Sequence, residues 1–244
     1  MANYSIRPVP ICKQTMDKGF MTWRMNYGQQ IDAGNYLFYI EGPKLNIIVD
    51  TGASAEMFTA RGYGGATDVQ TVEEGLGKLN LKPEDIDIVI ITHLHWDHAA
   101  FVHKFTKAKV IIQKTELDFA RNPHPANASA YDEKFIKDIN IEVVDGDEEI
   151  VAGVKVLLTP GHTPGNQSVV VETAKGLAII CGFCSTSDNF ELPPELRARG
   201  VQILPPGLHV NLFQAYDSAL RIKQEADIIL PLHDAKFLDE HRIP

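Results

Sequence analysis

One run of six residues constrains this chain more than any other part of its sequence. His93, His95, Asp97 and His98 lie within the segment His-Leu-His-Trp-Asp-His. The run directly follows residues 88–91, an unbroken β-branched stretch that predicts a buried strand. Side chains at the end of a buried strand are held on a rigid element, and imidazole together with carboxylate is typical of sites for zinc, iron or manganese. The run therefore predicts a metal site.

The spacing within the run also predicts how the ligands are directed. Alternation in an extended chain turns His93 and His95 toward the same side. Asp97 and His98 are expected to begin the next turn or helix and to approach from another direction, so that two adjacent ions could share the run. Three His and one Asp at these places would arise by chance only about once per thousand such chains.

Composition and charge exclude several classes of partner. The 244 residues carry a formal net charge of −9, and no cluster of Lys and Arg offsets it, which argues against nucleic acid. The longest apolar stretches fall short of the roughly 20 residues that cross a bilayer, so no membrane partner is expected. The three cysteines are few and odd in number, and the N-terminus lacks a basic region followed by an apolar run. We expect a cytoplasmic protein.

Apolar patterning predicts two groups of strands with helices between and after them. Strands are expected at residues 4–9, 35–40, 45–50, 86–92, 110–112, 141–144, 154–158, 168–171, 177–181 and 227–230, and helices at 68–80 and 211–225. This order predicts two sheets packed face to face and covered by helices, in one domain over residues 1–244. Residues 121–135 are rich in Pro, Ala and Asn, and they form either a plain surface loop or an excursion near the metal site.

Four motifs together resemble the metallo-β-lactamase superfamily. The His-x-His-x-Asp-His run follows a hydrophobic strand, and Asp50-Thr51-Gly52 is similar to the superfamily's early Asp-x-Gly turn. The segment 159–165, which contains His162, is similar to its Pro-Gly-His-Thr-x-Gly loop, and Leu232-His233-Asp234 to its terminal His. The resemblance covers nearly the whole chain. It implies an α/β fold, the four-layer αββα sandwich, with one or two metal ions in the groove between the sheets.

Three of these residues can also be argued from their surroundings. His162 lies between two glycines, in a turn that follows the expected strand 154–158, and His233 follows another apolar strand, so both are predicted ligands. Asp-Thr-Gly is also the signature of aspartic proteases, which need two such carboxylates, and only one triplet occurs here. We therefore expect Asp50 to accept hydrogen bonds from the backbone or from a ligand His near the site.

The pattern breaks at one expected ligand. Two-metal members of the superfamily carry a bridging Asp near the end of the strand after the Pro-Gly-His loop, but residues 178–185 contain no carboxylate, and the first is Asp188. Cys184 is our candidate replacement, because a thiolate binds zinc well and some β-lactamases of the superfamily use Cys in this part of the fold. Cys181 would face the opposite side of the strand. Both cysteines could instead be small buried apolar residues, and the second ion would then be weakly bound or absent.

The resemblance implies a mechanism of hydrolysis. We expect two ions per chain, zinc or else iron or manganese, one held by His93, His95 and His162 and one by Asp97, His98 and His233, with Cys184 near the second. Metal-bound hydroxide would attack the substrate, and the second ion would polarise its carbonyl. Asp97 is the predicted catalytic residue, because it could relay a proton to the leaving group. Such a site suits lactone, ester, thioester or amide hydrolysis.

Among the branches of the superfamily, the chain is most similar to the N-acyl homoserine lactonases. The shared features are Ser187-Asp188-Asn189-Phe190, the ending Leu232-His233-Asp234 and the length, whereas glyoxalase II thioesterases carry a helical domain after the terminal His. The branch's catalytic Tyr is expected just before Asn189, where Ser185, Thr186 and Ser187 stand. A lactone or related ester hydrolase is the leading interpretation. A thioesterase, a mononuclear iron oxidoreductase of the sulfur dioxygenase kind and a non-catalytic binding protein are alternatives.

Other segments leave their roles open. We expect a small-molecule substrate, and a homodimer is one expectation for the assembly. Residues 20–27 are rich in large side chains that could line an apolar acyl pocket, form a dimer contact or pack in the core. His103, His124, His209 and His241 have no partner pattern, and we assign them to the surface or the core.

Overall fold

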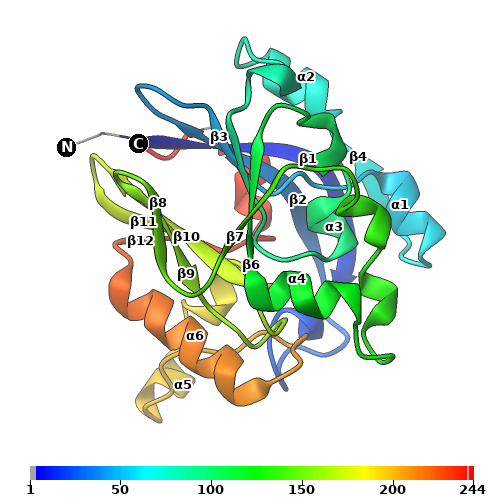
Figure 1. The fold of residues 1–244 in the computed structure, drawn as a ribbon. Coiled ribbons are helices and arrows are strands. Elements are labelled where there is room, and N and C mark those ends of the chain that lie inside the picture. The colour runs from blue at the N-terminus through cyan, green and yellow to red at the C-terminus, as the bar shows by residue number, and fades with distance from the viewer. Residues whose placement is uncertain (1–3, 241) are drawn as a thin grey trace.

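Two β-sheets form the framework of the computed structural model, which describes residues 4–240 and 242–244 (Figure 1). One sheet has the strand order β4-β1-β2-β3-β5-β6-β7 and the other β12-β11-β10-β9-β8. The strands of the first sheet are β1 (Ser5–Asp17), β2 (Gln30–Glu41), β3 (Ile47–Val49), β4 (Ala66–Asp68), β5 (Ile88–Ile90), β6 (Lys109–Gln113) and β7 (Ile141–Val144). Those of the second are β8 (Glu148–Val151), β9 (Val154–Leu158), β10 (Gln167–Thr173), β11 (Gly176–Ile180) and β12 (Ile228–Leu230).

Helices cover the outer face of each sheet (Figure 1). On the first sheet lie α1 (Ala55–Ala60), α2 (Val72–Gly77), α3 (Trp96–Ala99) and α4 (Lys114–Arg121), and on the second α6 (Leu212–Glu225), with the short α5 (Pro194–Ala198) beside it. Successive side chains of a strand point to opposite faces of its sheet, and in both sheets apolar residues occupy the two faces. In β2, Phe38 packs into the core between the sheets, whereas Leu37 packs under the helices. In β10, Val169 packs between the sheets, whereas Val170 packs with Ile222 of α6.

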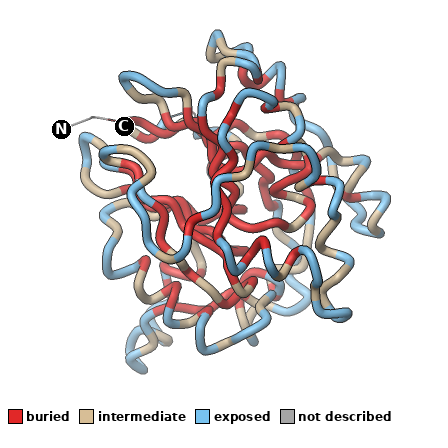
Figure 2. The backbone as a smooth tube through the Cα atoms, in the orientation of Figure 1, coloured by how far each residue is buried: buried red, intermediate tan, exposed pale blue. Residues whose placement is uncertain are grey.

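This arrangement confirms the predicted αββα sandwich. Figure 2 shows the buried residues concentrated along the strands of both sheets. Within the described residues, no helix is long and apolar enough to cross a bilayer.

Several observed elements differ from the predicted ones in length, and the helices α1, α4 and α5 and the strand β8 were not predicted. The strand β1 runs to Asp17, well beyond residue 9, because it pairs with β2 along nearly its whole length. The helix expected at 68–80 is shorter, since Thr71 caps α2 and forms a reciprocal pair of hydrogen bonds with Glu74, while residues 66–68 form the edge strand β4. Residues 121–135 contain two short 3-10 turns, Ala128–Ala130 and Glu133–Phe135.

The two sheets meet at the edge where several strands end. The backbone N–H of Gln167 donates to the Thr92 carbonyl at 2.9 Å, and its side-chain amide donates to the Ile91 carbonyl at 2.8 Å. These bonds join the start of β10 to the segment that leaves β5. The loops that follow β5, β9 and β12 carry the predicted ligands, and they converge at this edge.

Candidate metal centre and substrate pocket

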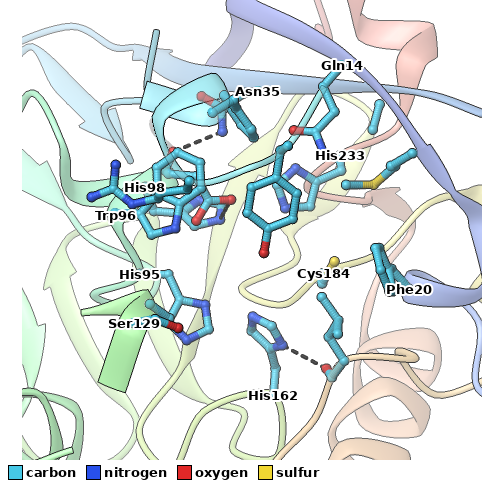
Figure 3. Close-up of a pocket in the computed structure, with 18 of the residues that line it drawn as sticks. Gln14, Phe20, Asn35, His95, Trp96, His98, Ser129, His162, Cys184 and His233 are labelled. Carbon is cyan, nitrogen blue, oxygen red and sulfur yellow. Dashed lines mark hydrogen bonds and ion pairs between the residues drawn. The ribbon is translucent and has the colours of Figure 1, made fainter. Parts of the chain in front are cut away.

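The loops at this edge gather six of the predicted ligands into two groups. The first group is His93, His95 and His162, and the second is Asp97, His98 and His233. Within each group, the atoms that could bind an ion lie within 4.8 Å of one another. In Figure 3, His95 and His162 face His98 and His233 across a common space. The structure thus brings together residues from three loops that are far apart in the sequence.

The first group has the spacing of a shared metal ion. Nε2 of His93 and Nε2 of His162 lie 3.2 Å apart. Two nitrogens bound tetrahedrally to one zinc ion at about 2.0–2.1 Å would be separated by about 3.3 Å. Nε2 of His95 is buried and has no hydrogen-bond partner in the described part of the chain. The donor set and its spacing fit a zinc-like ion.

The second group is organised by Asp50. Its carboxylate accepts hydrogen bonds from the Thr92 backbone N–H and hydroxyl, each at 2.8 Å, and from Nδ1 of His98 at 2.9 Å. This confirms the role predicted for the Asp-Thr-Gly turn. Asp50 itself adopts a positive φ of 57°, which Asp tolerates better than most residues. His98 in turn presents Nε2 to a carboxylate oxygen of Asp97 at 3.2 Å.

Backbone carbonyls fix the orientation of the remaining rings. Nδ1 of His162 donates to the Leu208 carbonyl at 2.7 Å, and Nδ1 of His233 donates to the Gly34 carbonyl at 3.0 Å. A donated Nδ1 proton leaves the Nε2 lone pair of a neutral imidazole available to an ion. Nδ1 of His93 lies 3.1 Å from the Thr92 hydroxyl, which places its Nε2 toward His162.

Charge and burial set the protonation of the site. Burial lowers the pKa of His162 and of His233 to about 4, and it lowers the pKa of His93 and His95 as well, so these rings are neutral at neutral pH. Burial also disfavours the charged form of His98, but Asp97 and Asp50 outweigh it and raise the pKa of His98 to about 10. Neutral imidazoles can bind a metal without first losing a proton.

Glu116 connects the loops that carry the first group. This carboxylate, near the start of α4, is buried and accepts four hydrogen bonds. Oε1 accepts from the Leu94 backbone N–H at 2.9 Å and from the Tyr131 hydroxyl at 3.3 Å. Oε2 accepts from the Thr163 hydroxyl at 2.6 Å and from the Gly165 backbone N–H at 3.2 Å. Glu116 therefore ties the His93–His95 segment to the His162 loop.

Tyr131 adds a second contact to this arrangement. Its ring lies edge-on to the ring of His95, with 5.0 Å between centroids. The segment 121–135 therefore does approach the metal centre, which was one of its two predicted roles. Neither Glu116 nor Tyr131 stands out in the sequence, because each is joined to the ligand loops only by long-range contacts.

The structure does not bring Cys184 into either group. It is buried and lines the same pocket, but its Sγ lies 3.2 Å from Sδ of Met21. Burial raises the pKa of the Cys184 thiol, and the charge of Asp97 raises it further. Cys181 is buried in the outer core against α6, as expected of a residue that faces the other side of the strand. Asp188 forms an ion pair with Lys18 at 2.8 Å and belongs to neither group.

Gly182, just after β11, occupies a position that leaves no space for a side chain. Its backbone N–H donates to the Ser168 hydroxyl at 2.9 Å, and a Cβ at this position would overlap the carbonyl oxygen of Gln167. The backbone of β11 and that of β10 are too close here for any side chain. A bridging carboxylate at Gly182 is therefore sterically excluded.

A cavity of about 450 Å³ opens beside both groups (Figure 3). His95, Asp97, His98, His162 and His233 all line it. Its other walls are mixed in character; the apolar residues include Met16, Phe20, Phe58, Leu208 and Val210, and the polar ones Gln14, Arg61, Tyr63, Asn127 and Ser129.

Residues 20–27 do not share one environment. Phe20 lines the cavity, Met21 is fully buried and Tyr27 is 69% exposed, so residues 20–27 serve more than one purpose. His209, which was assigned to the surface or the core, is partly exposed and lines the cavity, and its Nδ1 donates to the Pro206 carbonyl at 2.8 Å. His241 lies outside the described residues.

The fold and the paired ligand groups define a metal-binding αββα protein. A family model of the metallo-beta-lactamase superfamily matches residues 32–231, and the chain belongs to this superfamily. The predicted family and fold are thereby confirmed.

Within the superfamily the chain is similar to N-acyl homoserine lactonases. It is 30% identical over 201 residues to the enzyme of Bacillus cereus, and the match covers 75% of this chain and 77% of the relative. A lactonase of B. thuringiensis, solved with N-decanoyl-L-homoserine at its active site, has a TM-score of 0.76 and 26% identity, and covers 97% of this chain and 95% of its own. Another lactone hydrolase carries N-hexanoyl-L-homoserine at its catalytic metal centre, with a TM-score of 0.75, 26% identity and the same coverages.

Proposed function

We propose that this protein is a metal-dependent hydrolase that opens a lactone or a related ester. The observation that carries the proposal is the pair of ligand groups beside one cavity, each with the donors of a zinc-like site. The similarity to lactonases whose product lies at the metal centre supports the reaction class.

We further propose that the first group, His93, His95 and His162, and the second, Asp97, His98 and His233, each hold one ion. Zinc suits these imidazole and carboxylate donors best, with iron or manganese as alternatives. When bound, the metal supplies a water with its pKa lowered to about 7 and stabilises the charge that develops on the substrate carbonyl.

The protein's own residues position and relay the proton. Asp97 lines the cavity, and one of its carboxylate oxygens lies 3.2 Å from Nε2 of His98. Burial alone would raise the pKa of the Asp97 carboxyl, but the charge and the hydrogen bond of His98 outweigh burial and hold this pKa well below the usual range. The ionised Asp97 carboxylate can accept a proton at the attack step and return it to the leaving alkoxide. Asp50 keeps the His98 ring in place throughout.

The role of Cys184 remains a proposal as well. It lines the same cavity as His98 and His233, and we propose that its sulfur contacts the second ion when that ion is bound. We also propose a cytoplasmic location, which the three free, buried cysteines support.

Two measurements on the same preparation test this function. Protein purified without added metal is analysed for its elements, and it is then assayed against a panel of lactones, esters and thioesters. We expect about two zinc-like ions per chain and hydrolysis of lactones. Asp97→Asn is expected to lower kcat by about 10²- to 10⁴-fold, whereas Asp118→Asn, a matched change on an exposed ion pair, leaves it unchanged. One iron per chain with oxygen consumption on a persulfide would instead support the oxidoreductase alternative.

A further inference from the structure

The cavity beside the metal centre contains one cationic side chain that the proposed reaction does not use. Arg61 is the only Lys or Arg among the described residues that line it, and Asp97 is the only Asp or Glu. Asp97 is paired with His98. The guanidinium of Arg61 is therefore the one fixed positive charge that the cavity offers outside the ligand groups.

The protein leaves most of this guanidinium unpaired. One of its five N–H donors reaches the Met57 carbonyl at 3.3 Å, one turn back in α1. Within the described residues, no carboxylate lies within 4.0 Å of Arg61, whereas Arg7, Arg221 and Arg242 all have such a partner. An arginine that is paired with a carboxylate has few donors left for a ligand, but Arg61 keeps most of its N–H donors.

Arg61 is also held in place. Its guanidinium carbon lies 4.5 Å from the centre of the Trp96 ring, a cation–π arrangement. Trp96 is itself packed edge-on to Phe58 at 4.7 Å, and its ring lies 6.1 Å from that of Tyr63. Since Trp96 stands between the ligand residues His95 and Asp97 in the sequence, the charge is fixed beside the metal centre. A guanidinium that is already oriented loses little entropy when it binds a carboxylate.

The negative net charge of the protein makes a positive charge in the cavity important for an acidic substrate. A net charge of −9 repels anions in general, so an acidic substrate needs a local positive charge to enter. A neutral substrate makes no such demand. An arginine with a free planar fork matches the two oxygens of a carboxylate better than any uncharged group.

We propose that Arg61 binds a carboxylate that the substrate carries in addition to the ester bond that is opened, so that the preferred substrates are acidic lactones or esters. This inference rests on the proposed function and narrows its substrate class. The apolar wall formed by Phe20, Leu208 and Val210 would hold the hydrocarbon part of the same molecule.

Ligand binding tests the inference without turnover. The probes are N-succinyl-homoserine, whose acyl chain ends in a carboxylate, and the same molecule with that carboxylate replaced by a primary amide. Calorimetry on metal-loaded protein is expected to give a Kd about 10- to 100-fold lower for the carboxylate probe, the range for a hydrogen-bonded charge pair. Arg61→Met keeps an unbranched apolar stem over Trp96 and is expected to abolish this preference while leaving the Kd of the amide probe unchanged. Arg199→Met removes an exposed charge away from the cavity and should retain the preference.

Two results would overturn the inference: equal affinity of the wild type for both probes, or equal weakening of both by Arg61→Met, which would show that Arg61 only supports Trp96. Assay of the two corresponding lactones separates this inference from the proposed function. If neither lactone is opened but the binding preference holds, the proposed function fails and the assignment of Arg61 stands. If both are opened equally well and bound equally well, the function stands and the assignment of Arg61 falls.

Discussion

Replacing Glu116 tests whether a single buried carboxylate holds the metal-binding loops together. In Glu116→Gln, one oxygen becomes an amide nitrogen that can no longer accept. Each side of the carboxylate faces one hydroxyl and one backbone N–H. The hydroxyl on the altered side can rotate to accept from the amide, but the backbone N–H cannot.

The size of the effect follows from this count. One buried backbone donor without a partner costs about 1–3 kcal/mol, and the remaining bonds lose the assistance of the charge. We therefore expect Glu116→Gln to lower the free energy of unfolding by about 2–4 kcal/mol. Metal affinity is expected to fall about 10- to 100-fold, the usual range for residues that orient metal ligands.

Urea unfolding of the metal-free protein and chelator competition for zinc measure the two effects separately. Glu73→Gln is the matched control, because Glu73 is half exposed and pairs only with Lys104 at the surface, where such a pair contributes less than about 1 kcal/mol. If Glu116→Gln unfolds at the wild-type urea concentration and retains wild-type zinc affinity, Glu116 does not hold the loops together.

Three further changes probe other parts of the site. Gly182→Ala is expected to destabilise the protein by at least about 2 kcal/mol, because its Cβ would overlap a carbonyl of the adjacent strand, whereas Gly77→Ala in open space should be neutral or stabilising; equal urea midpoints would contradict this. The pKa values of His162 and His233 fall from 6.5 in the unfolded chain to about 4, so the unfolded chain binds more protons below pH 6.5 and the metal-free protein loses stability as the pH falls from 6.5 to 4. Each ring contributes about 3 kcal/mol to this loss, and a thermal midpoint that does not change between pH 7 and pH 5 would disprove the reasoning. Cys184→Ser should lower the zinc content from about two ions toward one if the sulfur binds metal, and unchanged content would assign Cys184 to packing alone.

The sandwich and the gathering of the candidate ligands were predictable because apolar strands and short motifs in the sequence indicate them. The candidate ligands His93, His95, Asp97 and His98 lie within six residues, directly after a strand whose apolar run is unambiguous. The short helices α1 and α3 have too few residues for a helical period to be recognised, and β8 is a partly exposed strand with little apolar patterning.

The supporting residues were not predictable because their partners are distant. Glu116 reaches Leu94 across 22 residues and Thr163 across 47, and in the sequence it is simply a charged residue in a helix. The sequence showed only that the expected carboxylate is missing near Gly182. The steric exclusion of a side chain there depends on how close the neighbouring strand lies. The position of the Arg61 guanidinium depends on the packing of Trp96 against Phe58 of α1, which the sequence does not show.

The central claim, hydrolysis that depends on metal at the two ligand groups, is tested most directly by a zinc titration of the metal-stripped protein. Formation of the hydroxy acid from a lactone is followed as zinc is added. We expect no activity in the stripped protein and a rise that saturates at about two equivalents per chain. Lactone opening by the stripped protein at the rate of the loaded protein would contradict the claim, as would a fully loaded protein that opens no lactone or ester.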